Sequence, residues 1–188
     1  MLIKKLIIFN KNDIIRFLKN YNRTGSEKLS NLVGKEFIDF ELPYIGDSGI
    51  ETYKLSNAID EHQSIVLAFF PAAWTGVCVK EMCSFRDDLK SFEDLDAKVI
   101  TISVDLPWAQ QHFKKDLKLN FLMVSDVEKK IIKAYDVEWP NFANLGVTVA
   151  NRAIFVIKSG KIVYQWVGEN PGKYPNFDEI KDVLKTAN

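Results

Sequence analysis

The fold is decided by one stretch, residues 65–87, which reads IVLAFFPAAWTGVCVKEMCSFRD. It begins with a run of apolar residues that stops at a proline. A short apolar run of this kind predicts a buried central strand over residues 65–70. Pro71 and Gly76 then predict a loop, because proline and glycine are the strongest local interruptions of regular structure.

A helix is predicted after this loop. Its signature is a set of side chains at helical spacing, formed by Cys78, Met82, Phe85 and Leu89. Thr75 is suited to be the N-cap residue, so Cys78 falls in the first turn. A helix N-terminus carries unpaired N–H groups and roughly half a unit of positive charge, and both stabilise an anion. The thiolate is the nucleophilic form of cysteine, so the position marks Cys78 as a candidate nucleophile.

This cysteine and two residues before it are spaced as in a known enzyme family. The pattern Pro71-x-x-x-Thr75-x-x-Cys78 resembles the active-site signature of the peroxiredoxins, the alkyl hydroperoxide reductase and thiol-specific antioxidant family. The resemblance implies that Cys78 attacks a peroxide and becomes a sulfenic acid. It also implies that Thr75 binds the thiolate and orients the peroxide, and that Pro71 shields the thiolate. The alternatives are a small core cysteine, a threonine that only caps the helix and a proline that only ends the strand.

An arginine far along the chain is also implied by the resemblance. Asn151 and Arg152, followed by the apolar residues 153–157, are similar to the family segment in which an arginine opens a strand and reaches the peroxidatic cysteine. Arginine stays charged and has a planar fork of donors, so Arg152 would stabilise the thiolate and bind a peroxide oxygen. The alternative is a surface arginine at a strand edge. Glu81 also matches the family, as part of the network that holds arginines in place, and Arg86 is a possible second arginine.

Cys83 is the candidate resolving cysteine. It lies five residues after Cys78, as in the Q-type peroxiredoxins, also called bacterioferritin comigratory proteins, and no cysteine follows it. Residues five apart in an intact helix have Cα atoms roughly 8.6 Å apart, whereas a disulfide tolerates about 7 Å. A disulfide between the two would therefore require the first turns of the helix to unwind. The alternative is that Cys83 is a helix core residue and an external thiol resolves Cys78.

Strand and helix patterns alternate through the rest of the chain. Alternating residues over 37–42, a turn at 46–49 and a second strand over 50–55 predict an N-terminal β-hairpin. Further elements are expected as strands over 98–104, 122–125, 153–157 and 162–167, and as helices over 107–116, 126–135 and 178–185. Such alternation predicts an α/β fold with a central mixed sheet flanked by helices. With its terminal hairpin it resembles the thioredoxin-like fold.

The N-terminal residues form a separate prediction. Residues 1–30 are expected to be an extension, either a short amphipathic helix after Asp13 or a poorly packed tail, and residues 31–188 the domain itself. The apolar run after Lys4 and Lys5 covers only residues 6–9, which is shorter than the roughly 7–15 apolar residues of a signal peptide. No window approaches the roughly 18 apolar residues of a membrane span.

Composition limits the classes of function. The chain has 188 residues, of which 47% are hydrophobic, enough for one globular domain. Lysine plus arginine and aspartate plus glutamate both number 25, so the balanced charge argues against nucleic acid or an anionic membrane surface as partners. Two cysteines make no disulfide framework, which favours a reducing, cytoplasmic location. No zinc spacing is present and only His62 and His112 could assist a metal, so no metal or other cofactor is expected.

The function predicted from the sequence is that of a thiol-dependent peroxidase for hydrogen peroxide and organic hydroperoxides. The resemblance implies that a thioredoxin-like or glutaredoxin-like protein reduces the oxidised enzyme, and that a homodimer forms through the face near Trp74. Two alternatives stay open: a one-cysteine peroxidase, and a catalytically idle thioredoxin-fold protein that acts as a holdase or binding module.

Overall fold

The computed structural model describes residues 30–61 and 64–186. Apart from Ser30, the extension predicted over residues 1–30 falls outside these ranges, so the domain boundary stays a prediction. Within the described residues, no helix is both long enough and apolar enough to cross a bilayer.

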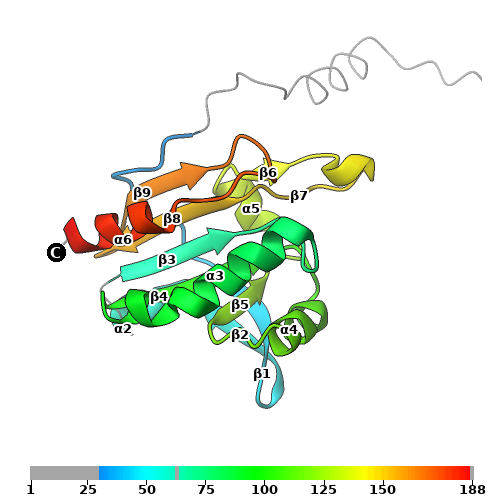
Figure 1. Cartoon of the computed structure of the whole chain (residues 1–188), viewed down its shortest axis with the longest axis horizontal. Helices are drawn as coiled ribbons and strands as arrows, with labels where there is room; N and C mark the ends of the chain where they lie inside the picture. The colour runs from blue at the N-terminus through cyan, green and yellow to red at the C-terminus, as the bar shows by residue number, and fades with distance from the viewer. Residues whose placement is uncertain (1–29, 62–63, 187–188) are drawn as a thin grey trace, which may run out of the picture. The chain divides into compact units, whose positions relative to one another are not determined.

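A five-stranded mixed sheet runs through the middle of the fold (Figure 1). Its strands are β3 (Ser64–Phe69), β4 (Ala97–Ser103), β5 (Leu122–Ser125), β8 (Ala153–Lys158) and β9 (Lys161–Val167). The spatial order is β5-β4-β3-β8-β9. The pairs β3–β4 and β4–β5 are parallel, and the pairs β3–β8 and β8–β9 are antiparallel. The predicted α/β architecture with a mixed sheet is therefore confirmed.

Each face of the sheet carries its own hydrophobic core, because side chains alternate between the two faces of a strand. Val66 and Ala68 of β3 face a core built with the helices α3 (Gly76–Glu93), α4 (Pro107–Asp116) and α6 (Phe177–Thr186). Figure 1 shows α3 and α6 on the same side of the sheet. Because β3 is buried on both faces, nearly all its residues are apolar, which explains the continuous apolar run in the sequence.

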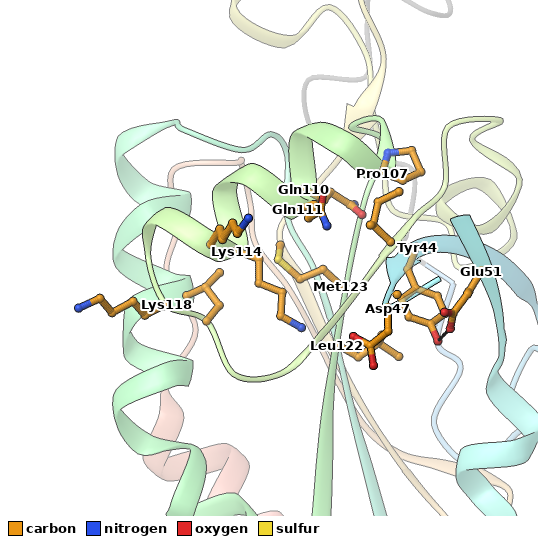
Figure 2. A pocket seen from close by; sticks show the side chains of 14 residues that line it. Tyr44, Asp47, Glu51, Pro107, Gln110, Gln111, Lys114, Lys118, Leu122 and Met123 are labelled. Atoms are coloured by element: carbon orange, nitrogen blue, oxygen red, sulfur yellow. Dashed lines mark hydrogen bonds between the residues drawn. The ribbon is translucent and has the colours of Figure 1, made fainter. Parts of the chain in front are cut away.

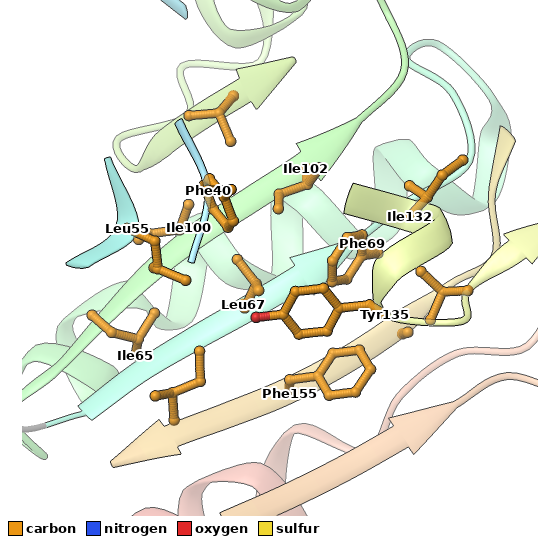
Figure 3. Packing of buried hydrophobic residues seen from close by; sticks show 14 of the residues in the cluster. Phe40, Leu55, Ile65, Leu67, Phe69, Ile100, Ile102, Ile132, Tyr135 and Phe155 are labelled. Carbon is orange, nitrogen blue, oxygen red and sulfur yellow. The ribbon is translucent and has the colours of Figure 1, made fainter. Parts of the chain in front are cut away.

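The other face of β3 presents Ile65, Leu67 and Phe69 to the second core (Figure 3). The helices α2 (Leu55–Glu61) and α5 (Lys130–Ala134) cover this face. The ring of Tyr135 lies 5.2 Å from that of Phe69 and 4.9 Å from that of Phe155, measured between centroids. Aromatic pairs at these distances and tilts add to the stability that burial alone gives.

The N-terminal hairpin exists, but its first strand is displaced from the prediction. The strands are β1 (Glu41–Gly46) and β2 (Gly49–Lys54), with Gly46 opposite Gly49. The alternation predicted as a strand over residues 37–42 reflects extended backbone with alternating burial. Only one isolated bridge, from Glu36 to Lys161, pairs the residues just before it. A strand also needs a paired partner. The turn sets the register of the hairpin, in which Glu41 is opposite Lys54, the last residue of β2, so the residues before Glu41 have no partner in this hairpin.

The helix α2 was missed, and Leu55 begins it instead of ending the second strand. Asp39 supplies the reason: its Oδ1 accepts a hydrogen bond of 2.9 Å from the N–H of Ser56, in the first turn. This carboxylate lies 17 residues away from the donor, so local sequence rules for helix caps could not identify it. The apolar residues Leu55, Ala58 and Ile59 do show helical spacing, which was the available signal.

The helix predicted over 126–135 is shorter than expected and begins at Lys130. Lys129 has a positive φ of 60°, so the preceding residues form a turn. The carboxylate of Asp126 still acts as the helix cap, since it accepts hydrogen bonds of 2.8–2.9 Å from the N–H groups of Lys130, Ile131 and Ile132. The predicted helix over 107–116 and strand over 122–125 agree with the structure to the residue.

Short elements complete the fold. They were not predicted, and they are β6 (Glu138–Trp139), β7 (Val149–Ala150) and a 3-10 turn, η1 (Phe142–Asn144). Strands of two residues carry too little periodicity to be recognised in a sequence.

Three segments that are distant in the sequence meet at one edge of the sheet. Phe69, the last residue of β3, is the register partner of Ala153, the first residue of β8. Ala153 is in turn the partner of Val167, the last residue of β9. The chain after β3, the chain before β8 and the chain after β9 therefore lie side by side. The first two of these segments carry the residues singled out in the sequence.

Candidate active site

The loop that follows β3 has a defined geometry. Pro71 is buried. Trp74 has a positive φ of 65°, which is uncommon for a residue with a side chain. The backbone of Thr75 caps α3, since its carbonyl accepts the N–H of Val79 at 2.9 Å. Its hydroxyl donates to the carbonyl of Ala72 at 3.0 Å and does not bond the N–H groups of the first helical turn, as a side-chain cap would.

An aspartate that the sequence analysis missed holds this loop. Asp105 lies just after β4, and its Oδ2 accepts hydrogen bonds from the N–H of Ala73 at 2.9 Å and from the hydroxyl of Ser103 at 2.8 Å. Gln110 of α4 donates to the same hydroxyl at 2.8 Å. The residues lie far from the loop in the sequence, so only the parallel pairing of β3 and β4 brings them to it.

Cys78 occupies the first turn of α3 and is fully buried in the core on that face of the sheet. Glu81, one helical turn later, is also fully buried. Residues three apart share a face of a helix, so both side chains point the same way. A buried cysteine and a buried carboxylate on one helix face both require polar partners or a change in protonation.

Arg152 is the partner of both, and it comes from the segment just before β8. Its Nη2 donates to Cys78 Sγ at 3.3 Å and to the carbonyl of Pro171 at 2.9 Å. Its Nη1 forms an ion pair with Glu81 Oε2. Arg152 is 1% exposed, so these contacts are shielded from water. The alternative of a surface arginine at a strand edge is wrong.

The backbone around Arg152 is itself fixed by hydrogen bonds. Asn151 Oδ1 accepts the N–H of Arg152 at 2.9 Å, and Asn151 Nδ2 donates to the carbonyl of Gly168 at 2.6 Å. The N–H of Gly168 donates back to the carbonyl of Arg152 at 2.8 Å. The start of β8 and the end of β9 are thereby tied together at the backbone of Arg152.

Burial and charge act against each other in this pair. Burial raises the pKa of Glu81 to about 7, while the charge and the hydrogen bond of Arg152 lower it. Desolvation lowers the pKa of Arg152, but the charges of Glu81 and of Cys78 outweigh it, so the net pKa is raised. The guanidinium group therefore keeps its positive charge beside the sulfur atom at any relevant pH.

The remaining predicted residues lie apart from this cluster. Cys83 is half-buried on α3, and both cysteines are free. The helix is continuous through both, as predicted for the reduced protein. Arg86 does not approach Cys78: its Nη1 donates to the carbonyl of Leu117 at 2.8 Å, and its Nε donates to Asp87.

A pocket lies elsewhere on the domain. It has a volume of about 600 Å³ and lies between the β1–β2 hairpin and α4 (Figure 2). Its lining includes Tyr44 and Glu51 of the hairpin and Lys114 of α4, whose pKa burial lowers. Cys78, Thr75 and Arg152 are not part of the lining. The chemistry suggested by the sequence therefore belongs to the buried cluster and not to this pocket.

Known proteins share both the sequence and the fold. Residues 33–165 match the AhpC/TSA family. Peroxiredoxin Bcp of Bacillus subtilis (strain 168) is 36% identical over 157 residues, which are 82% of this chain and 93% of that protein. Peroxiredoxin Q, chloroplastic, of Oryza sativa subsp. japonica is 38% identical over 101 residues, 53% of this chain and 45% of that one.

The crystal structure of peroxidoxin BcpB from Mycobacterium tuberculosis aligns with a TM-score of 0.72 at 27% identity, covering 85% of this chain and 99% of that one. The predicted thioredoxin-like fold and the predicted family are thereby confirmed. The chain belongs to the AhpC/TSA family of peroxiredoxins and is a thiol-dependent peroxidase.

Proposed function

We propose that Cys78 is the peroxidatic nucleophile and that Arg152 activates it. The observation that carries this proposal is the contact of 3.3 Å between Arg152 Nη2 and Cys78 Sγ inside the core. A fixed positive charge in a site of low dielectric stabilises a thiolate and the negative charge that develops on a leaving oxygen. The N-terminus of α3 adds unpaired N–H groups beside the same sulfur atom.

The reaction follows from these groups. The thiolate of Cys78 attacks one peroxide oxygen, the O–O bond breaks, and sulfenic acid forms. The departing hydroxide or alkoxide takes up a proton and leaves as water or alcohol. The hydroxyl proton of Thr75 is donated to the carbonyl of Ala72, so in this state the hydroxyl does not donate to the Cys78 sulfur, as the resemblance had implied. Its oxygen accepts a hydrogen bond from the peroxide and so orients it. Glu81 holds the guanidinium group through the ion pair, and Pro71 covers the sulfur atom.

Cys83 then resolves the sulfenic acid as an intramolecular disulfide. The Cys83 sulfur attacks the Cys78 sulfur, the S–O bond breaks, and water leaves. A thioredoxin-like or glutaredoxin-like protein reduces the disulfide. The alternative, resolution by an external thiol, is favoured by one observation: both cysteines lie in one uninterrupted helix, where their side chains diverge.

The oligomeric state and the location are further parts of the proposal. Trp74, Leu106 and Trp108 are 53–54% exposed, and the hydrogen bond from Ala73 to Asp105 brings their segments together. A second copy of this chain covers this patch, because clustered apolar side chains next to a functional loop mark interaction surfaces. The protein acts in the cytoplasm, where a reducing environment keeps both thiols free.

Intact mass after one equivalent of hydrogen peroxide tests the resolution step. A loss of two hydrogens indicates the Cys78–Cys83 disulfide. A gain of one oxygen that persists until a small thiol is added supports the one-cysteine alternative. An unchanged mass would refute the assignment of Cys78.

A further inference from the structure

The pocket between the β1–β2 hairpin and α4 is separate from the cluster around Cys78, yet it has the size of a ligand site. Its volume of about 600 Å³ lies within the range of roughly 300–1,000 Å³ that is typical of small-molecule sites. Part of its lining is apolar and consists of Leu119, Leu122 and Met123. An apolar wall favours a ligand that has a hydrocarbon part to bury there.

Lys114 brings a positive charge into this pocket. Its side chain is half-buried, and Figure 2 shows it extending from α4 towards the hairpin. Burial lowers the pKa of Lys114, and no neighbouring charge acts against this effect. Within the part of the chain that the structure describes, Lys114 therefore has no carboxylate partner. Burial of an unpaired charge costs free energy, and an anion bound in the pocket would recover it.

The two carboxylates of the opposite wall do not neutralise Lys114. Glu51 is engaged within its own hairpin: Oε2 accepts a hydrogen bond of 2.6 Å from the Tyr44 hydroxyl, and Oε1 accepts one of 3.2 Å from the N–H of Ser48. The Tyr44 bond is the main reason that the pKa of Glu51 is lowered. Asp47 also lines the pocket but has no effect on the pKa of Lys114. The ammonium group is therefore available to a ligand.

The charges of the lining indicate which kind of anion fits. Three lysines line the pocket, Lys114, Lys115 and Lys118, together with the carboxylates of Asp47 and Glu51. The lining therefore carries one net positive charge. A ligand with a single negative charge balances it, whereas the second charge of a phosphate dianion would be repelled by the two carboxylates. The pocket is thus suited to a monoanion that also has an apolar part.

The α4 wall of the pocket is held in place before any ligand binds. Gln110 of this wall is 2% exposed. Its Nε2 donates hydrogen bonds to Ser103 Oγ at 2.8 Å and to the carbonyl of Val124 at 2.9 Å. These bonds fix α4 to the ends of β4 and β5. A ligand therefore does not have to order this wall, which lowers the cost of binding.

We propose that this pocket binds a small carboxylic acid with an apolar body. The ammonium group of Lys114 donates to the carboxylate, and the hydrocarbon part lies against Leu119 and Met123. The site is separate from Cys78, so the proposal does not depend on the catalytic roles assigned above.

Octanoate is the probe for a test by NMR, in which backbone amide shifts are followed during a titration of the full chain. Saturable shifts are expected at the lining segments, residues 44–47, 110–119 and 122–123. Acetate has the same head group without the hydrocarbon chain and should bind at least about tenfold more weakly. Inorganic phosphate should give no saturable shift there. Absence of saturable octanoate shifts at these segments, or phosphate binding as tight as that of octanoate, would overturn the proposal.

Two variants make the test specific. Lys114→Met keeps an apolar side chain and removes the charge, so octanoate should bind about 10- to 100-fold more weakly, the range expected for loss of a hydrogen bond to a charged group. Lys133→Met is the matched control, because Lys133 is an exposed lysine on α5 outside the pocket; its affinity should equal that of the wild type. Equal affinities in wild type and Lys114→Met would place octanoate elsewhere, for example on the exposed Trp74, and would overturn the proposal. If Lys114→Met does not fold, the shift map of the wild type decides.

Discussion

Arg152 and Cys78 are 74 residues apart in the chain, yet Arg152 Nη2 lies 3.3 Å from Cys78 Sγ. The antiparallel register of β3 and β8 produces this contact, since it places Phe69 opposite Ala153. The same guanidinium group is bonded to Glu81 and to the carbonyl of Pro171. Its position beside the sulfur is therefore fixed by two further partners, which come from two different segments.

Cys78→Ser is expected to abolish peroxidase activity, because a hydroxyl group does not ionise near neutral pH. The measurement is peroxide consumption with a dithiol as reductant. Cys83→Ser is the matched control: without the dithiol it should still consume one equivalent of peroxide and stop at the sulfenic acid. More than a few per cent of wild-type activity in Cys78→Ser would contradict the assignment.

Arg152→Ala should slow peroxide attack by Cys78, because the thiolate and the leaving oxygen lose a fixed positive charge. The loss of a charge-assisted hydrogen bond predicts a decrease of about 10- to 100-fold in the attack rate. Because the variant leaves Glu81 buried without its partner, unfolding should also require about 3–5 kcal/mol less. Arg152→Lys keeps the charge but not the planar fork of donors, so its rate of peroxide attack should lie between those of the wild type and Arg152→Ala. An unchanged attack rate in Arg152→Ala, measured in a single turnover with one equivalent of peroxide, would remove Arg152 from the site.

Stability should depend on pH through Glu81. The carboxyl has a pKa of 4.5 when free and about 7 in the folded protein, where burial raises it. Between these values the folded protein binds more protons than the unfolded chain, so the free energy of unfolding falls as pH rises. This contribution is complete below pH 4.5 and is lost as pH passes through 7.

Glu81→Gln removes this titration. From pH 5 to pH 8 the wild type should therefore lose more free energy of unfolding than the variant does. Urea unfolding at both values measures it. Parallel behaviour of the two proteins would show that Glu81 does not titrate in this window.

Trp74→Ala should weaken the proposed homodimer. The exposed indole packs on Phe113, with ring centroids 5.2 Å apart, and the neighbouring Ala73 is hydrogen-bonded to Asp105, which precedes the exposed Leu106. Sedimentation velocity over a range of concentrations should show a monomer–dimer equilibrium in the wild type, displaced towards monomer in the variant. Val33→Ala, at an exposed apolar residue outside this patch, is the control. A wild-type protein that stays monomeric at all concentrations would rule the dimer out.

Oxidation should unwind the start of α3. In the reduced protein the helix begins at Gly76 and both cysteines are free. After one equivalent of peroxide, hydrogen exchange should increase over residues 74–84 and helical content should fall, while Phe85 and later residues stay protected. Cys83→Ser should show no such increase. Unchanged exchange in a protein with a chemically verified Cys78–Cys83 disulfide would show that the bond forms without unwinding.

The sequence by itself determined the local elements and the identity of the chemistry. The strand, the loop and the helix of residues 65–87 depend on apolar periodicity, on Pro71 and on residues at most a few positions apart. The same holds for the helix Pro107–Asp116 and the strand Leu122–Ser125, which were predicted to the residue. The spacing of Pro71, Thr75 and Cys78 was sufficient to identify the family.

Only the tertiary structure decided which distant groups meet. The start of α2 depends on Asp39, the loop after β3 on Asp105, and the position of the guanidinium group on the Pro171 carbonyl. None of these contacts follows from a local rule, because each joins residues between 17 and 32 positions apart whose proximity is set by strand register and by packing on the sheet. The first strand of the hairpin was misplaced for the same reason: alternation indicates an extended backbone, but only a paired partner makes that backbone a strand.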